Sequence, residues 1–140
     1  MGLVMTKVKL TNLFDVEKAR AGLIAEADIR SVEIEALVDT GAIGLAIPQD
    51  VADKLGLPIY RRRPVRVADG RAIEVADVGP LRFEVVGRDM ITEAMVLPAG
   101  TMPLFGAIQM EYLDLIVSPA TGEAIARDPN EYLVLLLRAG

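Results

Sequence analysis

The segment IEALVDTGAIGLAIP, residues 34–48, places the ionisable carboxylate of Asp39 next to a turn, directly after Ala36-Leu37-Val38 and shortly before Ala42-Ile43. A charge in such surroundings is costly unless a partner or a chemical role compensates for it. In one interpretation Asp39 and Gly41 simply form a turn between two strands, because both residue types tolerate the backbone angles of turns. In the other interpretation, the chain holds the carboxylate in a site shielded from water, where it has a chemical role. A turn in water would not need apolar residues on both sides, which favours the second interpretation.

Composition narrows the chemistry that is open to the chain. Its 140 residues, 52% hydrophobic and 4% aromatic, suit a single domain, residues 1–140, with a mainly aliphatic core. The sequence contains no Cys and no His, which excludes thiol nucleophiles, Ser-His-Asp catalysis and thiolate or imidazole metal sites. Acid–base chemistry then falls to carboxylates, Lys or Tyr. If the chain is a hydrolase, we expect a carboxylate hydrolase with no metal and no cofactor.

Charge and hydropathy argue against two classes of partner. The formal net charge of −5 disfavours nucleic acid, whose phosphates need a basic face. The basic run Arg61–Arg63 stands between Pro58 and Pro64, a context that favours a solvated loop over a phosphate-binding patch. No apolar run reaches the roughly 18–20 residues of a membrane span, and the N-terminus lacks a signal-peptide pattern. We therefore expect a cytoplasmic protein with no membrane partner.

Short alternating or apolar segments separated by turn residues predict a mostly β barrel or sandwich. The expected strands cover residues 4–10, 23–29, 31–38, 45–47, 81–86, 90–97, 115–117 and 132–137. Asp69-Gly70, between alternating segments, is a strong hairpin signal and predicts a hairpin over residues 65–75. Start and stop residues predict a short helix over 49–55, and a second is expected within 106–113. Residues 11–22 fit either a turn or a short helical piece.

Three motifs resemble, in type and order, those of the retropepsin-like aspartic proteases, the single-domain relatives of pepsin. Residues 36–42, ALVDTGA, resemble the catalytic Asp-Thr-Gly loop. Leu104-Phe105-Gly106 matches the apolar-apolar-Gly triplet that leads into a short helix in that family, here residues 107–113. Residues 65–78 match the flexible hairpin, the flap, between those two motifs. The resemblance spans roughly residues 31–119 and is greatest to bacterial and archaeal members, which carry a helix after the catalytic loop.

This resemblance implies a closed, mainly β barrel of the acid protease fold with one or two short helices. It also implies an aspartic endopeptidase that acts on peptide or protein substrates, with Asp39 as the catalytic residue. Thr40 would lock two loops together through its hydroxyl, the Gly41 amide would donate to the carboxylate, and Ala42 would leave room for substrate. The other implied site residues are those of the flap, Asp69, Gly70, Arg71 and Ile73, and those of the second loop, Leu104, Phe105 and Gly106.

The mechanism of this family needs two aspartates, and the chain contains Asp-Thr-Gly once. The resemblance therefore implies a homodimer in which two Asp39 side chains meet on a two-fold axis. The apolar segment 132–137 would be an aggregation hazard if left unpaired, and either pairing across the dimer or burial within one chain would cover it. An alternative of a different class is a retropepsin-like module that dimerises and binds peptides without cleaving them.

A few residues depart from the family pattern or compete with it. Retroviral members usually carry Arg and then an acid or Asn after the Gly of the second motif, where this chain has Ala107 and Ile108. Glu111 and Asp114 lie three apart on an expected helix, a spacing more typical of a solvated face than of a metal site. An apolar lining of the substrate cleft is expected from four residues, Ile43, Leu45, Ile73 and Phe105.

Overall fold

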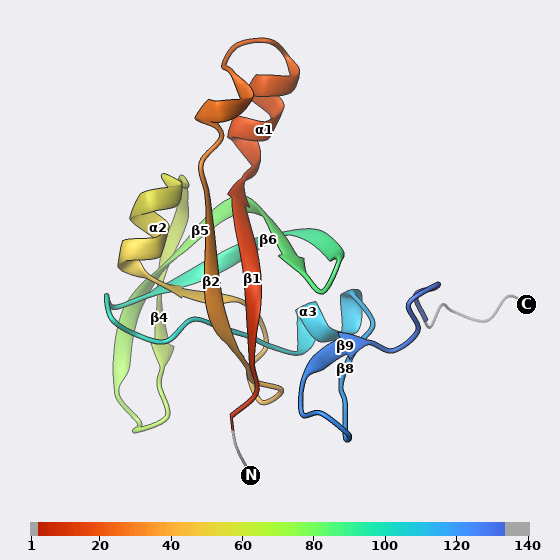
Figure 1. Cartoon of the computed structure of the whole chain (residues 1–140). Helices are drawn as coiled ribbons and strands as arrows, with labels where there is room; N and C mark the ends of the chain where they lie inside the picture. The colour runs from red at the N-terminus through yellow and green to blue at the C-terminus, as the bar shows by residue number, and fades with distance from the viewer. Residues whose placement is uncertain (1–2, 134–140) are drawn as a thin grey trace, which may run out of the picture.

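Six strands close into a barrel in the computed structural model, which describes residues 3–133 (Figure 1). Around the barrel, the strands are β1 (Met5–Asn12), β2 (Ser31–Val38), β7 (Leu104–Phe105), β3 (Ala46–Pro48), β6 (Arg88–Leu97) and β5 (Ala72–Val85). Pairing of β5 with β1 closes the ring, and β4 (Ile59–Arg66) pairs with β5 outside it. The expectation of a closed, mainly β barrel is confirmed.

The barrel encloses an aliphatic core that includes two aromatic rings. Phe83 and Phe105 are fully buried, and their rings meet edge to face with centroids 5.0 Å apart. In β1, Leu10 is buried while the neighbouring Lys9 is exposed, as the two-residue period of a strand requires. Removing each Phe side chain from water contributes about 2 kcal/mol of burial free energy. The alternation read from the sequence therefore corresponds to the observed inner and outer faces.

Two short helices and a small second sheet pack around the barrel strands. α2 (Gln49–Leu55) follows β3 directly and ends at Gly56, as the helix-stop signal predicts. α3 (Ala107–Tyr112) follows β7 and leads into the two-stranded sheet of β8 (Leu115–Val117) and β9 (Ala124–Ala126). Figure 1 shows this second sheet beside α3 and away from the β4–β5 hairpin. Within residues 3–133, no helix is long and apolar enough to cross a membrane.

The connection between β1 and β2 is helical, and the strand expected over residues 23–29 does not form. α1 (Leu13–Arg20) and the 3₁₀ helix η1 (Glu26–Asp28) project together from one end of the barrel (Figure 1). Gly22 turns the chain after α1 with a φ of 77°, and the side chain of Leu23 is left 74% exposed. This projecting segment has no neighbouring strand, so its backbone amides bond to carbonyls three to five residues earlier instead of to a ladder, as Asp28 does to Ala25 and Leu23 does to Lys18.

The basic run Arg61–Arg63 lies in β4, which corrects the expectation of a solvated loop. In the antiparallel register Arg61 stands opposite Asp77, and Arg63 stands two pairs further along, opposite Val75. The Asp77 carboxylate, 1% exposed, accepts from both guanidinium groups, with Nε–Oδ2 distances of 2.7 Å to Arg61 and 2.6 Å to Arg63. The Asp77 carboxylate on β5 thus offsets the repulsion between the two cations of β4, which alone would disfavour the strand.

The last described residues, 127–133, follow β9 without regular secondary structure. They are nevertheless attached by hydrogen bonds to Asp114, in the turn that follows α3. The Arg127 amide donates to the Asp114 carbonyl at 3.0 Å, and the Leu133 amide donates to the Asp114 carboxylate at 2.8 Å. The strand expected over residues 132–137 therefore does not begin at Tyr132, and its remaining residues lie outside the described part of the chain.

An ion pair between buried Asp15 and half-exposed Arg30 fastens the α1–η1 excursion, the projecting segment between β1 and β2, to the barrel. Asp15, 3% exposed, accepts from Arg30 through Nε at 2.8 Å, Nη2 at 3.0 Å and the backbone amide at 3.0 Å. The Arg30 guanidinium lies against Gly56, where an added Cβ would fall 2.0 Å from Nη1. These hydrogen bonds from Arg30 lower the pKa of Asp15 from its ordinary value of 3.8, against burial, which raises it. The excursion is therefore held by a charge-assisted contact as well as by packing.

We predict that Asp15→Asn lowers the free energy of unfolding at pH 7 by about 2 kcal/mol, since a charge-assisted contact is lost from a buried site. The folded pKa of Asp15 is depressed, so the stability it contributes is present above about pH 4 and is lost as pH falls through that folded value. Urea unfolding at pH 7 and pH 2 should show the variant's deficit shrinking at pH 2. The exposed Asp28→Asn is the control, and equal deficits at both pH values would contradict the assignment.

Candidate active site

The Asp39 loop leaves the end of β2 in a conformation fixed by its own backbone. The Gly41 amide donates to Asp39 Oδ1 at 3.0 Å, and the Ala42 amide donates to the Asp39 carbonyl at 3.0 Å. An added Cβ at Gly41 would lie 3.3 Å from Oδ1, a close approach that the glycine permits. Asp39 is partly buried, whereas Thr40 and Gly41 are exposed. The carboxylate is thus oriented by its loop and accessible from outside the chain.

The second motif pairs with the strand that leads to Asp39. β7 runs parallel to β2, with Leu104 opposite Leu37 and Phe105 opposite Val38. The Asp39 amide continues this ladder by donating to the Phe105 carbonyl at 2.9 Å. Two segments separated by more than sixty positions in the sequence therefore become adjacent at the Asp39 loop.

The turn after β7 then clasps the Asp39 loop from the other side. The Ala107 amide donates to the Ala42 carbonyl, and the Ile108 amide donates to the Ile43 carbonyl, both at 2.9 Å. Between these contacts, a Cβ added at Gly106 would fall 2.1 Å from the Ala42 carbonyl oxygen. Only a glycine allows this approach of two backbones, which explains why the second motif ends in that residue.

Gln109 completes this contact between the Asp39 loop and the turn at Gly106, which we call the clasp. The sequence did not lead us to expect this role for Gln109. Its side chain is 1% exposed, and Oε1 accepts from the Gly106 amide at 3.2 Å. In this way an otherwise unpaired amide at the start of α3 is satisfied. A polar residue three positions after the glycine is a known helix-start signal and was the available clue. The side chain stabilises the corner that carries Ala107 and Ile108 in place of the polar residues of retroviral members.

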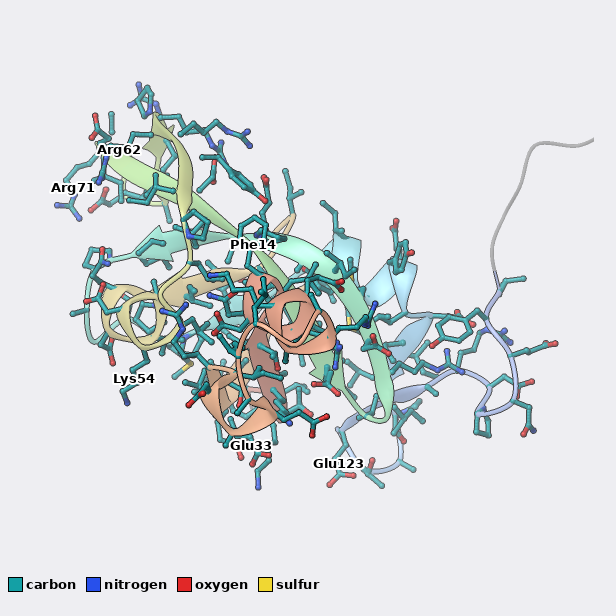
Figure 2. All side chains as sticks on the ribbon, turned by 90° about the horizontal axis from the view of Figure 1, so that it is seen from above. Phe14, Glu33, Lys54, Arg62, Arg71 and Glu123 are labelled. Carbon is teal, nitrogen blue, oxygen red and sulfur yellow. The ribbon has the colours of Figure 1, made fainter. Side chains whose placement is uncertain are left out.

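The flap hairpin forms where it was expected, with a self-contained tip. The Val67 amide donates to the Arg71 carbonyl at 2.9 Å, and Gly70 adopts a φ of 88°. Asp69 accepts from Arg71 through Nε at 2.6 Å and through the backbone amide at 3.0 Å. Half-buried Ile73 pairs across the hairpin with Val65. Figure 2 shows Arg71 and Arg62 on this projecting hairpin, far from Glu123 next to β9.

The base of the flap is held by ion pairs that the sequence analysis did not predict. Arg61 bridges buried Asp77 and Glu93 of β6, with an Nη2–Oε1 distance of 3.0 Å to the latter. Hydrogen bonds from Arg63 lower the pKa of Asp77, with the charge of Arg61 adding to that effect. The lower part of the hairpin is thereby tied to the barrel.

Some site residues are brought together and others are not. The segments 39–42 and 104–106 form one hydrogen-bonded unit. Within residues 3–133 no hydrogen bond joins this unit to the flap tip, although Figure 1 shows the tip and the loop after β2 at the same end of the barrel. Leu45 and Phe105, expected to line a cleft, are instead 4% and 0% exposed in the core. Phe105 packs edge to face against Phe83, and Leu45 immediately precedes β3, whose three residues are all buried.

A mainly β barrel in which an Asp-Thr-Gly loop is clasped by an apolar-apolar-Gly turn defines a protein of the aspartic protease class. Comparison with sequence families agrees with this. The profile described as "gag-polyprotein putative aspartyl protease" matches residues 25–107, more than half of the 140-residue chain. The chain therefore belongs to this retropepsin-like family. A comparison with curated proteins gave no match.

We predict that Gly106→Ala lowers the free energy of unfolding by about 2 kcal/mol, because its methyl group cannot fit beside the Ala42 carbonyl. The backbone resonances of residues 39–43 in nuclear magnetic resonance spectra should shift with it. Gly44→Ala is the matched control, since a Cβ there meets nothing within 4 Å. Equal stability losses in the two variants would contradict the clasp.

Proposed function

We propose that this chain is an aspartic endopeptidase whose active form pairs two copies, each contributing Asp39. The observation that carries the proposal is the oriented, accessible Asp39 carboxylate on a loop that the second motif clasps. Membership of the aspartyl protease family supports the same conclusion. Because each chain supplies one Asp-Thr-Gly, the second carboxylate comes from another copy related by a two-fold axis.

In the proposed reaction the paired carboxylates share one proton, since two negative charges at such close range repel each other. The ionised carboxylate takes a proton from a water molecule, and that water attacks the carbonyl carbon of the peptide bond. The protonated carboxyl polarises the carbonyl oxygen. A proton then passes to the leaving amine as the carbon–nitrogen bond breaks. No cofactor is needed for any of these steps.

The surrounding residues support defined parts of this reaction. The Gly41 amide holds Oδ1 of Asp39, which fixes the plane of the carboxylate. The exposed Thr40 is available to bond across the two-fold axis to the matching loop of the second copy. The flap, fixed at its base and free at its tip, would close over an extended peptide and exclude water. Asp69, Gly70, Arg71 and Ile73 are the proposed substrate contacts on it.

We predict that Asp39→Asn reduces peptide cleavage by at least about a thousandfold, because a general base is removed. Cleavage by the unaltered chain should be favoured at mildly acidic pH and be blocked by pepstatin-type hydroxyl inhibitors. A peptide-library assay across pH measures this, with exposed Asp50→Asn as the control variant. Cleavage that survives Asp39→Asn would refute the proposal. Specific peptide binding without turnover at any pH would instead favour the silent binding module.

Mixing the two proteins tests whether both copies contribute. An equal mixture of the unaltered chain and Asp39→Asn, after complete exchange, contains about one quarter of dimers with two intact aspartates. We predict that activity falls to about a quarter of that of the unaltered chain at the same total concentration. Activity of about one half would show that each copy cleaves peptides without the other. Asp50→Asn mixed in the same way should leave activity unchanged.

A further inference from the structure

β4 is the outer strand of the flap hairpin and has a neighbouring strand on one side only. The sheet ends at β4, which pairs with β5 and with no other strand of residues 3–133. The Val67 amide donates to the Arg71 carbonyl, so the alternation of an antiparallel pair turns the backbone groups of residues 62, 64 and 66 away from β5. β4 therefore presents an open edge at which a further strand can pair.

The same strand concentrates positive charge in an acidic chain. Residues 59–66 include four Arg and no acid, whereas the whole chain has a formal net charge of −5. Two of the four, Arg61 and Arg63, share the buried carboxylate of Asp77 on one face of the hairpin. The two-residue period of a strand places the other two cations on the opposite face.

Arg62 and Arg66 are the cations of that opposite face. Both are exposed, and no salt bridge within the described residues involves either of them. The Arg66 guanidinium donates to the Gly70 carbonyl, a neutral group that leaves its charge uncompensated. Glu74 stands opposite Pro64 on the same face, and in this part of the chain no ion pair joins it to either Arg. The two guanidinium groups are therefore available to anions of another molecule.

The spacing of these two cations fits a ligand in the extended conformation. Residues 62 and 66 are about 13 Å apart along a strand. A strand added at this edge places the side chains opposite Arg62 and Arg66 on the same face as the two guanidinium groups, with Cβ atoms about 5 Å away. Those two positions of the added strand are four residues apart. Pro64, between them, has no amide that such pairing would leave unsatisfied.

We propose that the open edge of β4 binds an extended acidic segment of another polypeptide, with carboxylates at positions i and i+4 of that segment against Arg62 and Arg66. The like charges of two β4 strands repel each other, so the edge disfavours a second copy and favours an acidic strand. The site lies outside the closed ring of strands and does not include the Asp39 loop. The proposal therefore goes beyond the peptidase assignment and does not depend on it.

Two synthetic Ser/Thr peptides of the same composition test the spacing directly. One carries Glu at positions i and i+4, which share a face of a strand, and the other carries Glu at i and i+3, which do not. Fluorescence anisotropy with the Asp39→Asn chain measures binding without interference from cleavage. The first peptide should bind at least about threefold more tightly than the second. Equal affinities, or no binding of either peptide, would overturn the proposal, because net charge alone does not distinguish the two.

Variants identify the cations that bind the peptide. Arg62→Gln and Arg66→Gln should each weaken binding of the i, i+4 peptide by about threefold. Lys54→Gln removes an equal charge from α2, which Figure 2 shows apart from Arg62, and should leave binding unchanged. An equal loss in all three variants would overturn the proposal. Tighter binding of a single-stranded DNA oligonucleotide, or self-association that needs the same two Arg, would assign the edge to a different occupant and also overturn it.

Hydrogen exchange reports the backbone pairing itself. Saturation with the i, i+4 peptide should slow exchange at the amides of Arg62 and Arg66 by at least about tenfold, because the added strand covers groups that face away from β5. The amide of Arg63, which is turned toward β5 in the same register, is the internal reference and should keep its rate. Unchanged exchange at Arg62 and Arg66 while the peptide is bound would overturn the proposal.

Discussion

The structure depends on one contact, the backbone clasp between the Asp39 loop and the turn at Gly106. Three amides, those of Asp39, Ala107 and Ile108, donate to carbonyls of the opposite segment at 2.9 Å, and the space between the segments excludes even a methyl group. Because these bonds involve backbone groups, they position the Asp39 carboxylate without using any side chain that the reaction needs. The clasp also continues the pairing of β2 with β7, so the contacts that position the site belong to the ladder of the barrel.

Two buried carboxylates attach the parts that extend from this barrel. Asp15 holds the α1–η1 excursion through Arg30, and Asp77 holds the base of the flap through Arg61 and Arg63. In each case the acid is nearly inaccessible while its cationic partner is about half exposed, so the cost of desolvation falls mainly on one member. The flap tip, by contrast, bonds only to itself within the described residues. The hairpin is thus attached to the barrel at its base and not at its tip.

The sequence predicted local features well and contacts between distant segments poorly. The Asp-Thr-Gly loop, the Asp69-Gly70 hairpin and the Gly56 helix end each depend on nearby residues, so their signals are complete within a few positions. Residues 23–29 have strand-like composition, but a strand also needs a neighbour, and the projecting excursion has none. The partners of Asp15 and Asp77 could not be predicted, because the sequence position of a charged residue does not specify which groups it contacts in the fold. Leu45 and Phe105 were assigned to a cleft because an apolar residue type does not by itself distinguish a cleft lining from the core, where both residues are buried.

The central claim is that two Asp39 loops make one site. The most direct test is the calorimetric stoichiometry of a pepstatin-type inhibitor at mildly acidic pH. A site built by two chains binds one inhibitor molecule for every two chains, and Asp39→Asn abolishes the heat of binding. One inhibitor molecule per chain, or binding that persists in the variant, would contradict the account.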